Sequence, residues 1–444
     1  MAVTKSNRRV KEQLALATCS LLTQQAGAAG NDWAFDSSLA FYSETDRVSV
    51  TKGMIDLSGT LLEGNNIDMM VVFDTMTGST PTGAVENSTV QTQTGVSGSG
   101  GFDSSGAPTS LAEFKDTRLA VKFDWEHENS SHFRTTYGGS ASVEKDYISL
   151  GYNFDMAFDS TSKLTTYEIG IAGAFDTISQ TGGTTPEPMG DVTNSATYDE
   201  GHRDSFELLL GMTNILSART LWQNNITYSM SDGYHTDPYK VISVVGNEQD
   251  RQAQINAALL DEADAQGVTV AELPTADVAR ITANFDNFEV EFQRLYESRP
   301  DSRTRTAWYS ELVTRLTDSQ TVHLSYRYYT DDWDITSHTL DYRHTFRMGG
   351  GKWYFEPQLR AYQQSAASFF HRSLVRGEAL PRYASADNRL DEVTGATVAF
   401  KFGKEIGENG EVRFRIAGFA WRAEEAVYDE TDAILVQLSM RLGF

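Results

Sequence analysis

Apolar and polar residues alternate along the last part of the chain. One face of this segment carries Ile434, Val436, Leu438, Met440, Leu442 and Phe444. The other face carries Gln437, Ser439, Arg441 and Gly443. A period of two is typical of a β-strand with one face against an apolar environment. The pattern therefore predicts a strand that begins near residue 433.

The apolar face of this strand ends on an aromatic residue, Phe444, at the last position of the chain. A terminal aromatic residue in this place is typical of the signal that the assembly machinery of outer-membrane barrels binds. We therefore expect Phe444 to act as a membrane-assembly signal and that machinery to be a partner of the chain.

Similar alternation recurs upstream, with charged side chains on the polar face. One example has Val322, Leu324, Tyr326 and Tyr328 opposite His323, Ser325, Arg327 and Tyr329. About sixteen such segments begin near residues 33, 48, 66, 116, 133, 146, 163, 204, 219, 303, 321, 338, 352, 393, 411 and 433. A dry core would need a partner for each inner charge, whereas a wet lumen would not. The pattern predicts an all-β fold, a transmembrane antiparallel β-barrel of about 16 strands.

The connections between these segments alternate in length. Long stretches at residues 79–115, 178–203, 231–302 and 364–391 all follow odd-numbered segments. Short turns at residues 63–65, 217–219, 317–320 and 348–351 all follow even-numbered ones. Long outer loops with short periplasmic turns are the rule for outer-membrane barrels. This sorting supports a single barrel over residues 30–444.

Composition excludes several other classes of protein. The chain has 444 residues, 37 basic and 61 acidic side chains, and a net charge of −24. Since no stretch approaches the roughly 18 consecutive apolar residues of a spanning helix, a helical membrane bundle is excluded. The acidic balance argues against nucleic acid as a partner. One cysteine excludes a disulfide framework or a Cys-rich metal site, and we expect no cofactor.

The first residues have the layout of a secretory signal. A basic segment is followed by the apolar run from Leu14 to Leu22 and by small residues at 26–30. This order predicts a signal peptide over residues 1–29, which is cleaved. Residues 16–19 offer an alternative, a lipobox that ends at Cys19, although Thr18 replaces the usual small residue.

The long loop at residues 231–302 contains two helical patterns. Residues 249–266 predict a helix that ends at Gly267, and Thr275 is the expected N-cap of a second helix. The apolar residues at helical spacing are Val278, Ile281, Phe285, Phe288 and Phe292. One interpretation is two helices that pack on each other or on the barrel rim. The other is a plug or lid over a pore.

Seven short stretches resemble, in the same order, the outer-membrane barrel family catalogued as domain-of-unknown-function 3570. They are YSETDRV at 42–48, DTMTGSTP at 74–81, DPYK at 237–240, RPDSRTR at 299–305, YRYY at 326–329 with DDW at 331–333, SHT at 337–339 and YASAD at 383–387. The resemblance implies the outer membrane of a Gram-negative bacterium, with outer-membrane lipid and lipopolysaccharide as surroundings. It implies no established activity and no catalytic residue. Through frequent gene neighbours, it also suggests a partner in periplasmic redox or metal maturation.

Acidic residues and one histidine gather at the predicted extracellular ends of the strands. They are Glu44, Asp46, Asp74, Asp331, Asp332, Asp334 and His338. Converging carboxylates would suit a hard cation such as calcium, or divalent bridging to lipopolysaccharide. Tight turns, in which Asp and Ser bond their own backbone, explain the same residues. Asp331 or Asp332 with His338 would form the acid–base pair of a rim hydrolase.

Charged residues also lie on the predicted inner faces. They are Arg327, Arg343, Arg347, Arg360, Arg413 and Arg415, with Glu168, Asp341 and Glu356. In an open pore these residues would create an electric field across the lumen that selects among solutes by charge. Alternatively, Arg–carboxylate pairs and Tyr329, Tyr354 and Tyr362 would close the lumen and support the wall.

The sequence therefore favours a porin-like channel for small polar solutes, without enzymatic activity. The first alternative is a non-transporting scaffold that binds a small lipoprotein or periplasmic partner linked to redox or metal maturation. A rim hydrolase is the third hypothesis.

Overall fold

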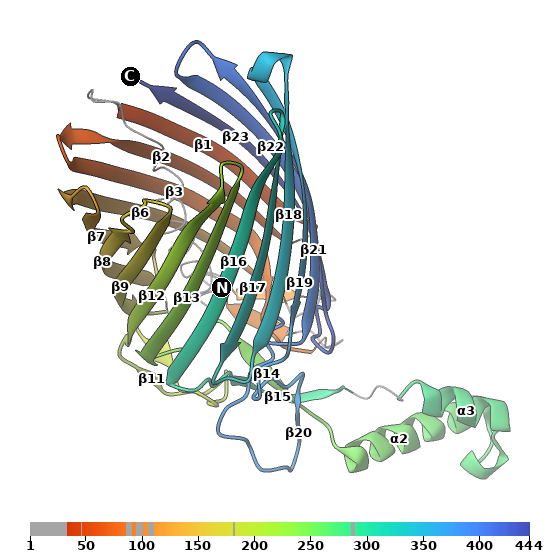
Figure 1. Ribbon diagram of the computed structural model, residues 1–444. Coiled ribbons are helices and arrows are strands. Elements are labelled where there is room, and N and C mark those ends of the chain that lie inside the picture. The colour runs from red at the N-terminus through yellow and green to blue at the C-terminus, as the bar shows by residue number, and fades with distance from the viewer. Residues whose placement is uncertain are drawn as a thin grey trace.

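The computed structural model describes residues 33–45, 47–85, 91–94, 101–104, 111–180, 183–285 and 289–444. Sixteen antiparallel strands form a closed barrel (Figure 1). They are β1 (Trp33–Glu44), β2 (Val48–Leu62), β3 (Asn65–Pro81), β6 (Leu111–Ser130), β7 (Phe133–Val143), β8 (Tyr147–Asp159), β9 (Thr165–Ile178), β12 (Gly201–Ser217), β13 (Thr220–Gly233), β16 (Ser302–Thr317), β17 (Gln320–Asp331), β18 (Thr336–Met348), β19 (Trp353–Gln364), β21 (Val393–Ile406), β22 (Gly410–Ala423) and β23 (Glu430–Gly443). The predicted barrel of about 16 strands is confirmed. The predicted signal peptide, residues 1–29, lies outside the described residues.

The barrel closes where its first strand pairs with its last. Leu39 of β1 lies opposite Leu438 of β23 in an antiparallel ladder. At the end of this ladder Trp33 N–H donates to the Phe444 carbonyl over 2.9 Å, and Phe444 N–H donates back over 2.8 Å. Closure leaves no strand of the barrel with an unpaired edge.

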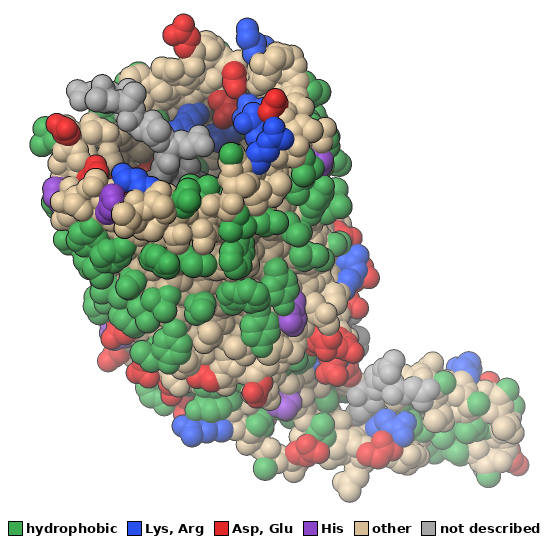
Figure 2. All heavy atoms as spheres, viewed as in Figure 1, with side chains coloured by type: hydrophobic (Ala, Val, Ile, Leu, Met, Phe, Trp, Pro, Cys, Tyr) green, Lys and Arg blue, Asp and Glu red, His purple; other side chains and the backbone are tan. Residues whose placement is uncertain are grey.

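The outer wall of the barrel is apolar. Side chains at alternate positions of each strand remain exposed, as for Leu39 (59%) and Leu438 (54%). Figure 2 shows hydrophobic side chains over the middle of this wall. Trp125, Trp222 and Trp353 lie toward one end of it, each exposed by more than a third. An apolar band flanked by aromatic residues is the surface that lipid requires of a barrel.

The two ends of the barrel differ in their connections. Short turns join β2 to β3, β12 to β13, β16 to β17 and β18 to β19, the last through η2 (Gly349–Gly351). Gly64, with φ of 73°, turns the chain between β2 and β3. We call this the turn end. The opposite end, the loop end, carries the four long connections (Figure 1).

Three segments at the loop end form a compact unit, which we call the loop cap: residues 234–247, 289–301 and 365–392. Its centre is a three-stranded sheet of β14 (Val241–Val245), β15 (Glu291–Tyr296) and β20 (Leu374–Val375). Ile242 of β14 and Ala384 are fully buried in one apolar cluster. Smaller strand pairs in other loops are β4 (Gln91–Thr94) with β5 (Gly101–Ser104), and β10 (Thr185–Pro186) with β11 (Thr197–Tyr198).

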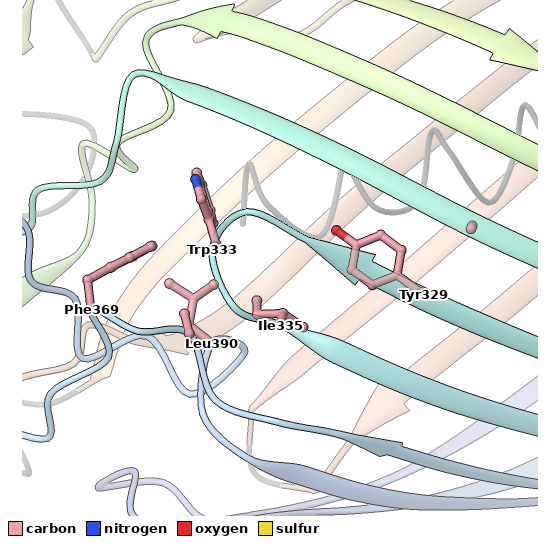
Figure 3. Close-up of a cluster of buried hydrophobic side chains, with 7 residues drawn as sticks. Tyr329, Trp333, Ile335, Phe369 and Leu390 are labelled. Atoms are coloured by element: carbon pink, nitrogen blue, oxygen red, sulfur yellow. The ribbon is translucent and has the colours of Figure 1, made fainter.

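A second apolar cluster joins the loop cap to the strand ends. Trp333 and Ile335, from the β17–β18 connection, lie beside Phe369 and Leu390 of the cap (Figure 3). The Trp333 and Phe369 rings meet edge to face, with centroids 5.1 Å apart. This contact fixes the cap on the barrel through buried apolar surface rather than through the backbone alone.

The long loop at residues 231–302 holds two helices, as predicted: α2 (Glu248–Gln266) and α3 (Thr275–Ala283), with η1 (Val270–Glu272) between them. α2 ends at Gly267, which adopts the left-handed conformation. The prediction that Thr275 is an N-cap is wrong, because Pro274 occupies that position and Thr275 is the first helical residue. Among the residues that the structure describes, no helix is long and apolar enough to cross a membrane.

The predicted apolar stripe does not continue along one helix. α3 ends at Ala283, and Phe292 lies in β15, where the chain pairs with β14. Phe288 lies outside the described residues. Tertiary strand pairing has overridden a spacing that also fitted a helix.

The helices contact each other rather than cover the barrel. Arg280 of α3 lies 3.2 Å from Glu262 of α2, and Gln266 donates to Asp277 over 3.2 Å. In Figure 1 the pair extends away from the loop end. Mutual packing therefore fits the structure, and the position of the pair does not fit a plug.

We predict that the barrel folds without this helical pair. Replacing residues 248–290 by a short Gly-rich turn should leave the β14–β15 ladder and the melting temperature of the barrel unchanged, because the ladder lies outside the replaced segment. Heat-dependent electrophoretic mobility measures this. Leu438→Arg, which places a charge on the exposed apolar face of the closing strand β23, is the destabilising control. A deletion variant that fails to refold would contradict the prediction.

Candidate functional site

Strand alternation turns charged residues to the inside of the barrel. The predicted inner residues Arg327, Arg343, Arg360, Arg413, Arg415 and Glu356 all lie on barrel strands, on the face opposite the exposed apolar positions. Arg347 has the same parity but lies at the turn end, half exposed and 3.4 Å from Glu405. Figure 2 shows the turn end hollowed, with Lys and Arg side chains inside it.

Part of this inner charge is neutralised by ion pairs. Arg343 lies 2.8 Å from Glu311 and 3.2 Å from Asp341. The other pairs are Lys401 with Glu356, at 2.6 Å, and Arg413 with Asp36. These contacts fit the interpretation of paired charges that support the wall.

Other inner charges have no ion pair within the described residues. Asp56, Asp68 and Glu168 form none, and Asp68 lies directly opposite Asp124 in the ladder. Arg327 lies over the Tyr329 ring at 5.7 Å, and Arg415 donates to the neutral Gln358 over 3.0 Å.

These groups lie on opposing parts of the barrel. The acids lie on β2, β3 and β9, whereas the arginines lie on β17 and β22. In the order of strands around the barrel, other strands separate the acids from the arginines in both directions. The lumen therefore has an acidic wall and a basic wall, and opposed charges of this kind set a field across it.

The predicted rim residues do not converge. Glu44 of β1 lies 3.5 Å from Arg47, and Asp74 of β3 lies 2.5 Å from Arg118, so each carboxylate has its own partner. Asp332 accepts from Thr304 N–H over 2.9 Å, and Asp334 has a φ of 65° in its turn. Asp46 lies outside the described residues. These contacts agree with the ordinary interpretation of turn and rim pairing.

The hypothetical acid–base pair is not formed either. Asp331 is tied to Arg303 and accepts from the Tyr329 hydroxyl over 2.7 Å. His338 instead faces outward, with its Nδ1 atom 2.7 Å from the Tyr326 hydroxyl. Because the two side chains point to opposite sides of the wall, they cannot share a proton without a change of strand register.

A different acidic group does converge at the loop end. Carboxylate oxygens of Asp116, Glu144 and Asp146 lie within 4.8 Å of one another. They come from β6 and the β7–β8 connection and are the only such group in the described part of the chain. Three carboxylates suit a hard cation in chemistry. Sequence reasoning did not single them out, since they share no local motif.

The loop cap contains a buried ion cluster of six residues: Asp237, Lys240, Glu297, Arg299, Asp387 and Arg389. Arg299 lies 2.6 Å from Glu297 and 2.9 Å from Asp387. Arg389 bonds Asp387 and lies 3.3 Å from Asp237. Three positive and three negative groups thus balance across all three cap segments. Buried charges are tolerated only with such mutual pairing.

Burial and pairing shift the ionisation of this cluster. Burial alone would raise the pKa of Asp387, but Arg389 and Lys240 hold it well below its usual range. Burial lowers the pKa of Lys240, although Asp387 opposes this. Asp387, at the centre of the cluster, is therefore ionised at neutral pH.

Sequence reasoning missed the cluster although its motifs were visible. The stretches at 237–240, 299–305 and 383–387 supply Asp237, Lys240, Arg299 and Asp387. They lie in irregular loops, where neither periodicity nor spacing indicates which residues meet. The available signal was that oppositely charged residues recur in the stretches of the family resemblance.

The profile of a protein family described as "Protein of unknown function (DUF3570)" matches residues 11–442. No curated protein matches the chain.

Solved structures that the chain is similar to include OccK2 (OpdF) of Pseudomonas aeruginosa, with 6% identity over 95% of this chain and 100% of that one, at a TM-score of 0.39. A BenF-like porin from Pseudomonas fluorescens Pf-5 is 5% identical over 94% of this chain and 100% of that one, with a TM-score of 0.40. The CymD monoaromatic hydrocarbon channel is 8% identical over 93% of this chain and 89% of that one, with a TM-score of 0.39. At these values the similarity carries no information about a solute.

We predict that Arg299→Met opens the loop cap. It would leave Glu297 and Asp387 buried without their main counter-charge, which costs about 3–5 kcal/mol. Hydrogen exchange should show lost protection at residues 236–242 and 383–389, while the barrel strands stay protected. Arg372→Met is the matched control, because its pair with Glu289 is partly exposed and contributes about 0–1 kcal/mol. Equal effects of both variants would contradict a central role for the cluster.

His235 should make the cap sensitive to acid. Burial and the nearby Arg203 lower its pKa from 6.5 to about 3. Its Nδ1 atom lies 2.7 Å from the Gly233 carbonyl. Because the unfolded segment binds a proton more readily, cap stability should fall as pH drops from 6.5 toward 3. Hydrogen exchange of residues 234–245, corrected for intrinsic rates, measures this, and His235→Gln should flatten the pH dependence. A wild-type cap with no added exchange at low pH would refute the assignment.

Proposed function

The chain belongs to the DUF3570 family, and we propose that it is a porin-like channel for small polar solutes in the outer membrane of a Gram-negative bacterium. The proposal includes export by cleavage of residues 1–29 and assembly through the strand that ends at Phe444.

One observation carries the proposal: charged side chains without ion partners line the inside of a closed barrel with an apolar outer wall. Asp56, Asp68 and Glu168 on one side and Arg327 and Arg415 on the other form no ion pair within the described residues. Ions left in a dry interior would change protonation or rearrange to find partners. Water inside the barrel stabilises them, and a barrel filled with water conducts.

The opposed walls also support selection among solutes. A transverse field orients dipolar solutes and hinders those whose charge meets the wrong wall. The loop cap stands at one mouth of this path, where its fixed shape would limit solute size.

A non-transporting scaffold is the second candidate function. The ordered loop cap and the projecting helices favour it, since they offer a rigid outer surface for a small lipoprotein or a redox partner. The two functions differ in whether the lumen conducts.

Single-channel recording of the refolded mature protein in a planar bilayer tests the channel. We expect steady conductance of porin size. If a barrel that is shown to be folded passes no current, the channel function is contradicted and the scaffold function is favoured. Repeating the recording after replacement of residues 248–290 tests the helical pair, and we expect the same conductance because these helices lie away from the barrel.

Charge substitutions on each wall should shift ion selectivity in opposite directions. Asp56→Asn with Asp68→Asn should raise the anion-to-cation permeability ratio about twofold, and Arg327→Gln with Arg415→Gln should lower it about as much. Reversal potentials in a salt gradient measure both. Arg347→Gln is the control, since this residue is half exposed at the turn end. Unchanged reversal potentials in both double variants would mean that these walls do not border the ion path.

A further inference from the structure

Two arginines on the inner wall have no acceptor for their side-chain N–H groups. Arg327 of β17 and Arg360 of β19 form no ion pair and donate no side-chain hydrogen bond within the described residues. Arg327 lies over the Tyr329 ring, 5.7 Å from its centroid. A guanidinium carries several N–H donors, has no acceptor and keeps its charge in a protein. Both side chains are therefore available to an anion.

Both side chains can also be reached from the lumen. Each is partly exposed and occupies an inner position, because the neighbouring Tyr328 (39%) and Leu359 (55%) are exposed on the outer wall. The exposed part of each arginine therefore faces the inside of the barrel. Figure 2 shows this inside hollowed from the turn end, with Lys and Arg side chains within it.

The two arginines lie close enough to act together. Only β18 separates their strands, so about 10 Å lie between them in the direction of the ladder, and their charges repel each other. Asp341 of β18 is directly opposite Arg360 but does not bond it. Its carboxylate instead lies 3.2 Å from Arg343 and accepts from Gln358 over 2.5 Å. An anion with two charged groups would stabilise both cations.

We propose that Arg327 and Arg360 bind a short dicarboxylate, with one carboxylate on each guanidinium. The planar fork of a guanidinium matches the two oxygens of a carboxylate, and such charge-assisted bonds are stronger than bonds between neutral groups. A solute with one carboxylate leaves one arginine unoccupied, and a neutral solute leaves both. The inference rests on the proposed channel, because it names the solute class that the channel passes.

Calorimetric titration of the refolded full barrel in detergent with succinate tests binding, at low salt so that screening is weak. Butyrate, with a single carboxylate, and the neutral succinamide are the comparison ligands. Succinate should bind about fivefold or more tightly than butyrate, and succinamide should show no heat of binding. If inorganic phosphate binds as tightly as succinate, the arginines take any small anion, and the dicarboxylate assignment is wrong.

Glutamine variants test the two arginines. Arg327→Gln and Arg360→Gln should each weaken succinate binding about fivefold or more, since one charge-assisted contact is lost. Arg347→Gln is the matched control: it removes the same charge from the inner side of β18, but at the turn end, where this arginine already pairs with Glu405. It should bind succinate as the native protein does. Equal losses in all three variants would mean that net charge acts without a site, and would overturn the inference.

A lysine variant decides the matter if a glutamine variant fails to fold. Arg360→Lys keeps the charge but lacks the planar fork. It should leave the reversal potential unchanged and still weaken succinate binding about threefold. If it binds succinate as tightly as the native protein, charge alone is sufficient and the two-arginine site is contradicted.

Binding and conduction separate the two proposals. A barrel that binds succinate through Arg327 and Arg360 but passes no current has the site without the channel function. A barrel that conducts while succinate binding is absent, or is equal to butyrate binding, has the channel without the site and overturns this inference.

Discussion

Closure of the hydrogen-bond ladder between β1 and β23 is the constraint on which the rest of the structure depends. A lipid-facing strand has no water for its N–H and C=O groups, so every strand must be paired on both sides. The reciprocal bonds between Trp33 and Phe444 complete this circle at the turn end. Once the ladder is closed, strict alternation sends one set of side chains to the apolar outside and the other set inward, whatever their charge.

Charged side chains of this protein lie in two different environments, the loop cap and the inner wall of the barrel, and they are paired differently in each. In the loop cap, Arg299, Glu297 and Asp387 are excluded from water and satisfy one another at short distance. On the barrel wall, Asp68 lies opposite Asp124, which pairs with Lys122 at 2.5 Å, whereas Asp68 itself has no ion pair within the described residues. Fully paired charge stabilises a rigid unit, whereas an unpaired charge on the inner wall depends on water.

The barrel could be predicted from the sequence because its signal is local and repeated. Each strand shows a period of two, and the connections alternate between short and long. The loop cap could not, since the contacts between Asp237, Glu297 and Asp387 join residues far apart in irregular segments. For Phe292, helical spacing and strand pairing fitted the same residues, and only the partner strand β14 decided between them.

The candidate site shows the same division between local and non-local information. Alternation placed Arg327 and Glu168 on the inner face, but it could not show which inner charges find partners. That depends on cross-strand register, which sets Arg343 beside Glu311 and leaves Glu168 beside Gly211. Gly211 carries no side chain and so gives no periodic signal. Its role arises only when the register brings Glu168 and Asn225 to either side of it, and the set of inner charges that stay unpaired is therefore a property of the closed ladder rather than of any single strand.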